Sequence, residues 1–320
     1  MVPDAKFLGQ RTGIWDLLKE LTGVAEPERH LRGFTLRLGD GSHWWVVGLP
    51  PASYWVERLA SMLHLRQEVA YGDYMMVILE GKTPLEGIKR LPDSGWTALN
   101  NSYLRLWYRM DSPNIVVELT TPLSEDYGYI SLRSALRFVF RQSIQRGGLP
   151  LHAALVEHQG KGVLLVGTSG TGKSTCCRRL SPPWQARCDD EVLLTLAPDG
   201  RYLAHPFPTW SDYLLQREKN SFRSQTEDPS LLAGIFFIEQ SPFDECLPVA
   251  PAKALVELIT ATQVVLYTHL WYCDPEEARS IRGAMFTNAC NLIHRVPLFN
   301  LRVSLTGGFW EHIEAALTRL

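Results

Sequence analysis

The sequence predicts an α/β protein in two parts: an α+β N-terminal domain over residues 1–147 and an α/β domain over residues 148–320. A chain of 320 residues is long enough for one large or two ordinary domains. Residues 34–48 alternate in hydrophobicity around a Gly-Asp-Gly turn, which is typical of an antiparallel hairpin. Residues 162–180 have the pattern of a buried strand, a glycine-rich loop and a helix, which is typical of a parallel α/β layer.

The first part continues with short apolar strands and amphipathic helices. Strands are predicted at 75–79, 103–108 and 115–119, and helices over 54–65 and 130–144. Four tryptophans either pack in the core or line a ligand groove, and packing is the favoured interpretation. They are Trp44, Trp45, Trp96 and Trp107.

The second part alternates strands and helices. The predicted strands are 151–156, 162–166, 192–196, 234–239 and 296–303. The predicted helices are 174–180, 252–260, 278–294 and 311–317. Two polar stretches, 219–229 and 240–251, are expected to be mobile loops.

Composition excludes several functional classes. The net charge of −2 gives no general electrostatic basis for binding nucleic acid or an acidic membrane. No apolar run approaches the roughly 18–20 residues that span a bilayer, and the first residues lack a signal-peptide pattern. The six cysteines form no C-x-x-C pair, so we expect reduced thiols in a cytoplasmic protein.

Residues 167–174, Gly-Thr-Ser-Gly-Thr-Gly-Lys-Ser, match the phosphate-binding pattern G-x-x-x-x-G-K-[ST]. Glycines let backbone N–H groups converge on phosphate oxygens, and the following helix adds partial positive charge. Lys173 is expected to reach the β and γ phosphates of ATP, and the Ser174 hydroxyl to bind Mg²⁺. The expected nucleotide-binding residues are Gly167, Thr168, Ser169, Gly170, Thr171, Gly172, Lys173, Ser174 and Thr175.

Three further features flank this loop. His152 lies on the strand before it, Asp189-Asp190 follows the helix after it, and His205-Pro206-Phe207-Pro208 precedes Trp210-Ser211-Asp212. From the residues alone, the acidic pair is equally well explained as a turn or a helix cap. A single histidine on an apolar strand is more often a hydrogen-bonded core residue than a functional one.

In this order, the motifs resemble those of the HPr kinase/phosphorylase family and its P-loop kinase relatives. The resemblance covers about residues 149–196 and continues more weakly through 232–240 and 296–301. Within that group the chain looks like the SynChlorMet cassette C proteins, whose gene clusters also hold radical SAM enzymes and a short precursor peptide. The resemblance implies an HPr-kinase-like P-loop domain over residues 148–320.

The resemblance also implies roles for individual residues. Kinases of the family move the γ-phosphoryl group of ATP to a serine hydroxyl with the help of Mg²⁺. Asp189 matches the base for that hydroxyl, Asp190 the carboxylate that supports the base or the metal, and His152 the active-site histidine. The expected catalytic residues are therefore Asp189, His152 and Lys173, and the expected metal-binding residues are Ser174 and Asp190.

The expected acceptor is a Ser or Thr of a peptide or small protein, modified during maturation of a ribosomally made peptide. A small-molecule acceptor stays open. Family members are often oligomeric, which leaves a homo-oligomer open as well. Residues 1–147 carry no recognisable catalytic group, so they are expected to hold the substrate or to serve assembly.

The chain departs from the family pattern. The Glu-containing signature after the acidic pair is missing, and Asp212 and Glu191 are the candidates to replace its carboxylate. The C-terminal signature of the reverse reaction is also missing, which argues against HPr as the acceptor and against phosphorylase activity. A rival hypothesis uses Glu239, which ends an apolar strand as in a Walker B motif and would make the chain an ATPase or a nucleotide-dependent binding switch.

Overall fold

The structure of the chain is a computed structural model that divides into two compact units, residues 1–37 with 42–135 and residues 38–41 with 136–320. The predicted boundary at residue 147 follows helix α3 (Glu125–Gln145), whereas the units part inside that helix, between Ala135 and Leu136. The structure describes residues 14, 16–19, 21, 23, 25, 32–67, 73–81, 95–100, 104–109, 112, 114–119, 125–214, 225–272 and 275–319.

In its described part, the first unit holds a seven-stranded sheet in the order β3-β1-β2-β4-β7-β6-β5. Its outer pairs are antiparallel, as expected, but the central pairs β2–β4 and β4–β7 are parallel. The elements are β1 (Arg32–Arg37), β2 (His43–Gly48), α2 (Ser53–Leu63), β3 (Arg66–Gln67), β4 (Tyr74–Glu80), β5 (Thr97–Asn100), β6 (Leu104–Tyr108) and β7 (Ile115–Leu119).

The four tryptophans singled out in the sequence are core residues. The indoles of Trp45, Trp96 and Trp107 pack with Val47, Val77 and other aliphatic side chains of the sheet. Trp44 is also fully buried and stacks on Tyr74. Packing therefore explains all four tryptophans, and the alternative of a tryptophan-lined groove is wrong.

In its described part, the second unit holds an eight-stranded sheet, in which β8 and β13 are the longest strands. Strand β8 pairs with β9, β10 and β11, and strand β13 pairs with β9, β12 and β15. With the β11–β12 pair, the strands β8, β9, β13, β12 and β11 close a ring of pairings. The strands are β8 (Leu149–His158), β9 (Lys161–Val166), β10 (Gln185–Cys188), β11 (Glu191–Leu196), β12 (Tyr202–Pro206), β13 (Ser230–Gln240), β14 (Glu245–Pro248) and β15 (Leu298–Val303).

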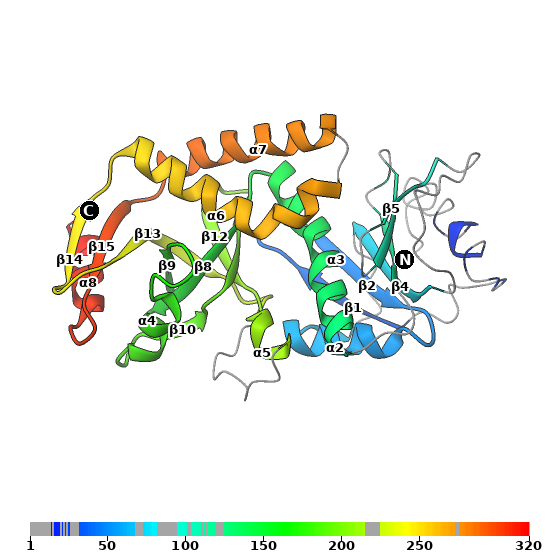
Figure 1. Cartoon of the computed structure of the whole chain (residues 1–320), viewed down its shortest axis with the longest axis horizontal. Coiled ribbons are helices and arrows are strands. Elements are labelled where there is room, and N and C mark those ends of the chain that lie inside the picture. Colours follow the sequence, from blue (N-terminus) through cyan, green and yellow to red (C-terminus); the bar gives the residue numbers. More distant parts are fainter. Residues whose placement is uncertain are drawn as a thin grey trace. The chain divides into compact units, whose positions relative to one another are not determined.

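Helices cover both faces of this sheet. Figure 1 shows α6 and α7 over one face and α4 and α8 on the other. Successive side chains of a strand point to opposite faces of the sheet, so alternate apolar residues face one layer of helices. On the face covered by α4 and α8, Val163 and Leu165 of β9 share one buried cluster with Cys176 of α4 and Phe309 of α8. The helices are α4 (Lys173–Arg179), α5 (Trp210–Leu214), α6 (Pro251–Tyr272), α7 (Pro275–Ile293) and α8 (Phe309–Thr318).

Two predictions about loops have different outcomes. The stretch 240–251 was expected to be mobile, but it contains β14, which pairs antiparallel with β15 along Glu245–Pro248. The other predicted loop is 219–229, of which residues 219–224 lie outside the described part of the chain. Helix α6 continues to Tyr272, well past the predicted end at residue 260.

Five of the six cysteines lie in the described part, and all five are free thiols as predicted. Cys273 lies outside it. Burial raises the pKa of Cys176 to about 11 and that of Cys188 to about 12, which keeps both protonated near neutral pH. Among the described helices, none has the length and apolar character that crossing a bilayer requires.

Candidate functional site

The glycine loop, residues 167–174, leaves the carboxyl end of β9 and leads into α4. Gly170 and Gly172 have φ of +83° and +105°, a region that side chains other than glycine adopt only with strain. No atom lies within 4 Å of the position that a Cβ would take at either residue. A Cβ at Gly167 would lie 2.6 Å from Thr171 Oγ1, so glycine is needed there for close approach. The loop is thus tightly folded at its base and open around Gly170 and Gly172.

Lys173 folds back onto this loop. Its Nζ donates to the carbonyl oxygens of Gly167 at 2.7 Å and Thr168 at 3.2 Å, and to Nε2 of His152 at 3.0 Å. The side chain is buried, and desolvation lowers its pKa, although the carboxylates of Asp190 and Asp189 oppose that effect. A cation is therefore held beside the open part of the loop without a carboxylate in direct contact.

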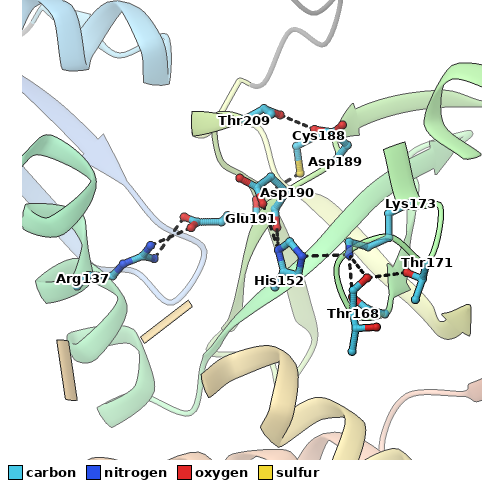
Figure 2. Close-up of polar contacts among 11 residues, drawn as sticks. Arg137, His152, Thr168, Thr171, Lys173, Cys188, Asp189, Asp190, Glu191 and Thr209 are labelled. Carbon is cyan, nitrogen blue, oxygen red and sulfur yellow. Dashed lines mark hydrogen bonds and ion pairs between the residues drawn. The ribbon is translucent and has the colours of Figure 1, made fainter. Parts of the chain in front are cut away.

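His152 joins the glycine loop to the acidic pair. On β8 it lies opposite Glu191 of β11, and its neighbour Ala153 lies opposite Val166 at the end of β9. Because the Lys173 ammonium only donates, His152 Nε2 accepts and Nδ1 carries the proton. Nδ1 then donates to Asp190, at 3.0 Å from its carbonyl oxygen and 3.1 Å from Oδ1 (Figure 2).

Asp189 and Asp190 lie between β10 and β11, and their carboxylates have different partners. Asp190 contacts His152, and its carbonyl also accepts the backbone N–H of Ala153 at 3.1 Å, which continues the ladder between the strands. Asp189 is only 5% exposed, and the Thr209 hydroxyl donates to its Oδ1 (Figure 2). A different side chain thus holds each carboxylate: His152 holds that of Asp190, and Thr209 holds that of Asp189.

Glu191 does not belong to this group of side chains. Its carboxylate is buried against the guanidinium of Arg137 on α3, with oxygen–nitrogen distances of 2.8 and 3.3 Å. Figure 2 shows this pair pointing away from His152 and Lys173. The hypothesis that Glu191 replaces the missing carboxylate is therefore wrong, because both of its oxygens are already bonded to an arginine.

A pocket of about 390 Å³ brings most of the predicted residues together. Its lining residues come from β8, the glycine loop, α4, the acidic pair and the segment after β12. They are His152, Ser169, Gly170, Gly172, Lys173, Ser174, Thr175, Arg178, Asp189, Asp190, Thr209, Ser211 and Asp212. Gly167, Thr168 and Thr171 do not line it; they form the base of the loop.

The segment after β12 supplies the predicted candidate Asp212 and two residues that were not predicted as site residues, Thr209 and Ser211. Phe207 and Trp210 are buried anchors beside these pocket-lining residues. The alternation of large apolar and small polar residues in Phe207-Pro208-Thr209-Trp210-Ser211-Asp212 is the signal that could have identified them.

Glu239 lies elsewhere on the sheet. Its half-exposed carboxylate accepts a hydrogen bond from Asn300 Nδ2 at 2.8 Å and lies 3.5 Å from Lys253 Nζ. It is not among the residues that line the pocket. Within the described residues, no group of three or more His, Cys, Asp or Glu side chains is arranged to hold a metal by itself.

Residues 115–318 match the family described as SynChlorMet cassette protein ScmC. No match was found among curated proteins. The matched region contains the glycine loop, the acidic pair and every other residue of the pocket, and it covers more than half of the chain. The chain therefore belongs to the SynChlorMet cassette protein ScmC family.

Proposed function

We propose that the chain is an ATP- and Mg²⁺-dependent phosphotransferase that moves the γ-phosphoryl group to a hydroxyl, in the manner of HPr-like serine kinases. The observation that supports this proposal is the convergence of the glycine loop, Lys173, His152 and the acidic pair on one pocket. Phosphoryl transfer needs a phosphate cradle, a divalent cation and a group that receives the acceptor's proton, and all three can be assigned here.

The glycine loop fits a triphosphate. Backbone around Gly170 and Gly172 is open on the pocket side, and close approach of backbone N–H groups to phosphate oxygens needs that space. Lys173 now donates to two loop carbonyls and His152, which are neutral acceptors. Phosphate oxygens are stronger acceptors for an ammonium, so bound nucleotide would offset the desolvation that lowers the Lys173 pKa.

The pocket offers oxygen ligands that could hold Mg²⁺ if bound nucleotide and water supplied the rest of its coordination shell. Ser174 and Asp190 line the same pocket, and both offer the oxygen ligands that this ion prefers. The few protein ligands agree with the usual Mg²⁺ site, which takes one or two side chains together with substrate phosphates. When bound, the ion would neutralise charge on the transferred group. His152 holds the Asp190 carboxylate in place through its Nδ1–H.

Asp189 is the group assigned to receive the acceptor's proton. As the hydroxyl oxygen bonds to the γ-phosphorus, its proton passes to Asp189 and the bond to ADP breaks. Thr209 fixes the orientation of the Asp189 carboxylate through a hydrogen bond to its Oδ1. Asp212 lies in the same pocket, so it is our candidate to replace the carboxylate of the Glu-containing signature that HPr kinases carry and this chain lacks.

The expected acceptor is a Ser or Thr of a peptide or small protein, such as the precursor peptide of the cassette. The ATPase alternative receives no support from geometry, because the Glu239 carboxylate contacts Asn300 and Lys253 rather than the pocket. A small-molecule kinase would use the same phosphate site and differ only in the acceptor.

Asp189→Asn tests the mechanism with ATP·Mg labelled in the γ position and the precursor peptide as acceptor. An amide cannot take the proton, so label transfer should fall at least about a hundredfold while ATP affinity is kept. Glu239→Gln is the matched control and should transfer normally. Label released as free phosphate, with Glu239→Gln inactive and Asp189→Asn normal, would establish the ATPase alternative instead.

A further inference from the structure

Three parallel strands end at one edge of the second unit's sheet. Strand β13 pairs in parallel with β9 on one side and with β15 on the other. The glycine loop follows β9, residues 241–244 follow β13, and residues 304–308 follow β15. Ligands of open α/β sheets bind outside the carboxyl ends of parallel strands, so these three loops frame the same side of the sheet.

Side chains fasten the three loops to one another. Gln240, at the end of β13, donates to the carbonyl of Gly170 in the glycine loop at 3.0 Å. Arg179 of α4 donates to the carbonyl oxygens of Ser304, at 2.6 Å, and Gly307. Asp244 accepts the backbone N–H of Ser304, which joins the loops after β13 and β15. The loops after β13 and β15 are thereby held against the glycine loop and the helix that follows it.

Each of these two loops carries a large apolar side chain in water. Phe243 is 55% exposed in the loop after β13, and Leu305 is 84% exposed in the loop after β15. Single exposed apolar residues are common on proteins. Here Phe243 precedes Asp244 and Leu305 follows Ser304, the two residues that join the loops. The loop that carries Phe243 begins directly after Gln240, which contacts Gly170 of the glycine loop.

The position of the acidic pair indicates which way a bound nucleotide would run across the glycine loop. Asp189 and Asp190 contact the sheet through β8 and β11, on the side of β9 opposite to β13. The γ-phosphate must face that pair for transfer to occur. The nucleoside end of the triphosphate then extends to the other side of β9, over the loops after β13 and β15.

We propose that the loops 241–244 and 304–308 form a subsite for the nucleoside base, in which Phe243 stacks on the ring and Leu305 packs against it. This inference deepens the proposed function and rests on it. Aromatic stacking accepts any base, because every base has a π face.

The test is calorimetric titration of the full chain with ATP·Mg and, separately, with inorganic tripolyphosphate·Mg. Phe243→Ala and Leu305→Ala remove the two apolar side chains. Val256→Ala is the matched control, since Val256 is 65% exposed on α6 and belongs to neither loop. We expect Phe243→Ala to weaken ATP binding about tenfold, Leu305→Ala to weaken it less, and Phe243→Trp to retain it. Tripolyphosphate should bind all variants and the parent chain equally.

The outcomes separate the two proposals. If both alanine variants bind ATP as the parent chain does, while Lys173→Ala loses ATP, the base subsite is wrong and the phosphate site stands. If the parent chain binds neither ATP nor tripolyphosphate, the proposed function fails first. If the alanine variants lose tripolyphosphate as strongly as ATP, the two loops act on the phosphates or on the fold, and the base subsite is again wrong.

Discussion

Asp189 and Asp190 are adjacent in the sequence, yet they have different surroundings, and this separation is the central feature at the residue scale. Asp190 faces His152, which in turn accepts a hydrogen bond from Lys173. Asp189 faces Thr209 and is nearly inaccessible except from the pocket. In our account the Asp190 carboxylate serves the cation and the Asp189 carboxylate serves the acceptor.

Thr209→Val tests the second of these roles. Valine has the shape of threonine without the hydroxyl, so the Asp189 carboxylate loses the donor that orients it. A hydrogen bond to a charged group is worth about 1.5–3 kcal/mol, so we expect the rate of phosphoryl transfer at saturating ATP to fall about tenfold or more. The KM for ATP should not change, because the Thr209 hydroxyl donates to Asp189 and not to the glycine loop.

The matched variant is Thr209→Ser, which keeps the hydroxyl and should retain most of the rate. Steady-state assays of label transfer with both variants decide the question. A Thr209→Val variant that is as fast as the parent chain, or one that raises the KM for ATP instead of lowering the rate, would show that Thr209 does not position Asp189.

Sequence reasoning identified the site residues that belong to a motif and missed those that depend on packing. His152, Lys173 and the acidic pair were predicted and do meet in one pocket. Thr209 was missed, because its role depends on the buried anchors Phe207 and Trp210 on either side of it. Glu191 was retained as a candidate because its partner, Arg137, is 54 residues away in the sequence.

At the scale of elements, His205 of β12 ties three segments of the second unit together. Its Nδ1 lies 2.7 Å from the carbonyl of Thr226, and its Nε2 accepts the N–H of Gly39 at 2.9 Å. Both contacts fit a neutral ring with the proton on Nδ1. Desolvation lowers the pKa of His205 to about 4, with only partial opposition from the bond to Thr226.

This contact makes the folded state sensitive to acid. The unfolded chain protonates His205 near pH 6.5, whereas the folded chain resists until about pH 4, so the unfolded state binds more protons between these values. The contribution of His205 to the free energy of unfolding is complete above pH 6.5 and is lost as the pH falls towards 4. Over that range the loss is about 3 kcal/mol.

Urea unfolding of the parent chain and of His205→Asn at several pH values between 7.5 and 4 measures this loss. Asparagine does not titrate, so the difference in the free energy of unfolding between the two proteins should shrink by about 3 kcal/mol as the pH falls. The other histidines contribute equally to both proteins and cancel. A difference that stays constant over the whole range would mean that His205 is not held neutral by the fold.

The elements that sequence reasoning predicted well are those with a strong local pattern. The hairpin of β1 and β2, the long helix α3 and strand β7 follow from alternation or helical spacing. Strands β10 and β14 have only four residues each and no clear alternation, and pairing with β8 and β15 stabilises them. The parallel centre of the first sheet, β2-β4-β7, depends on contacts between distant segments that no local pattern encodes.

At the scale of the whole molecule, the two units differ in their relation to the candidate site. Every described residue that lines the pocket belongs to the second unit. The first unit buries Trp44, Trp45, Trp96 and Trp107, so these four do not supply an apolar groove for a peptide. Its expected role in holding the substrate or in assembly stays a prediction.

The central claim is that the glycine loop binds the triphosphate of ATP through Lys173. Calorimetric titration of the parent chain and of Lys173→Ala with ATP·Mg tests it most directly, with Lys253→Ala as a control for loss of a lysine that contacts Glu239 outside the pocket. We predict saturable binding to the parent chain and the control, and a loss of affinity of at least about tenfold in Lys173→Ala. Equal affinity in all three proteins, or no binding by the parent chain, would contradict the account.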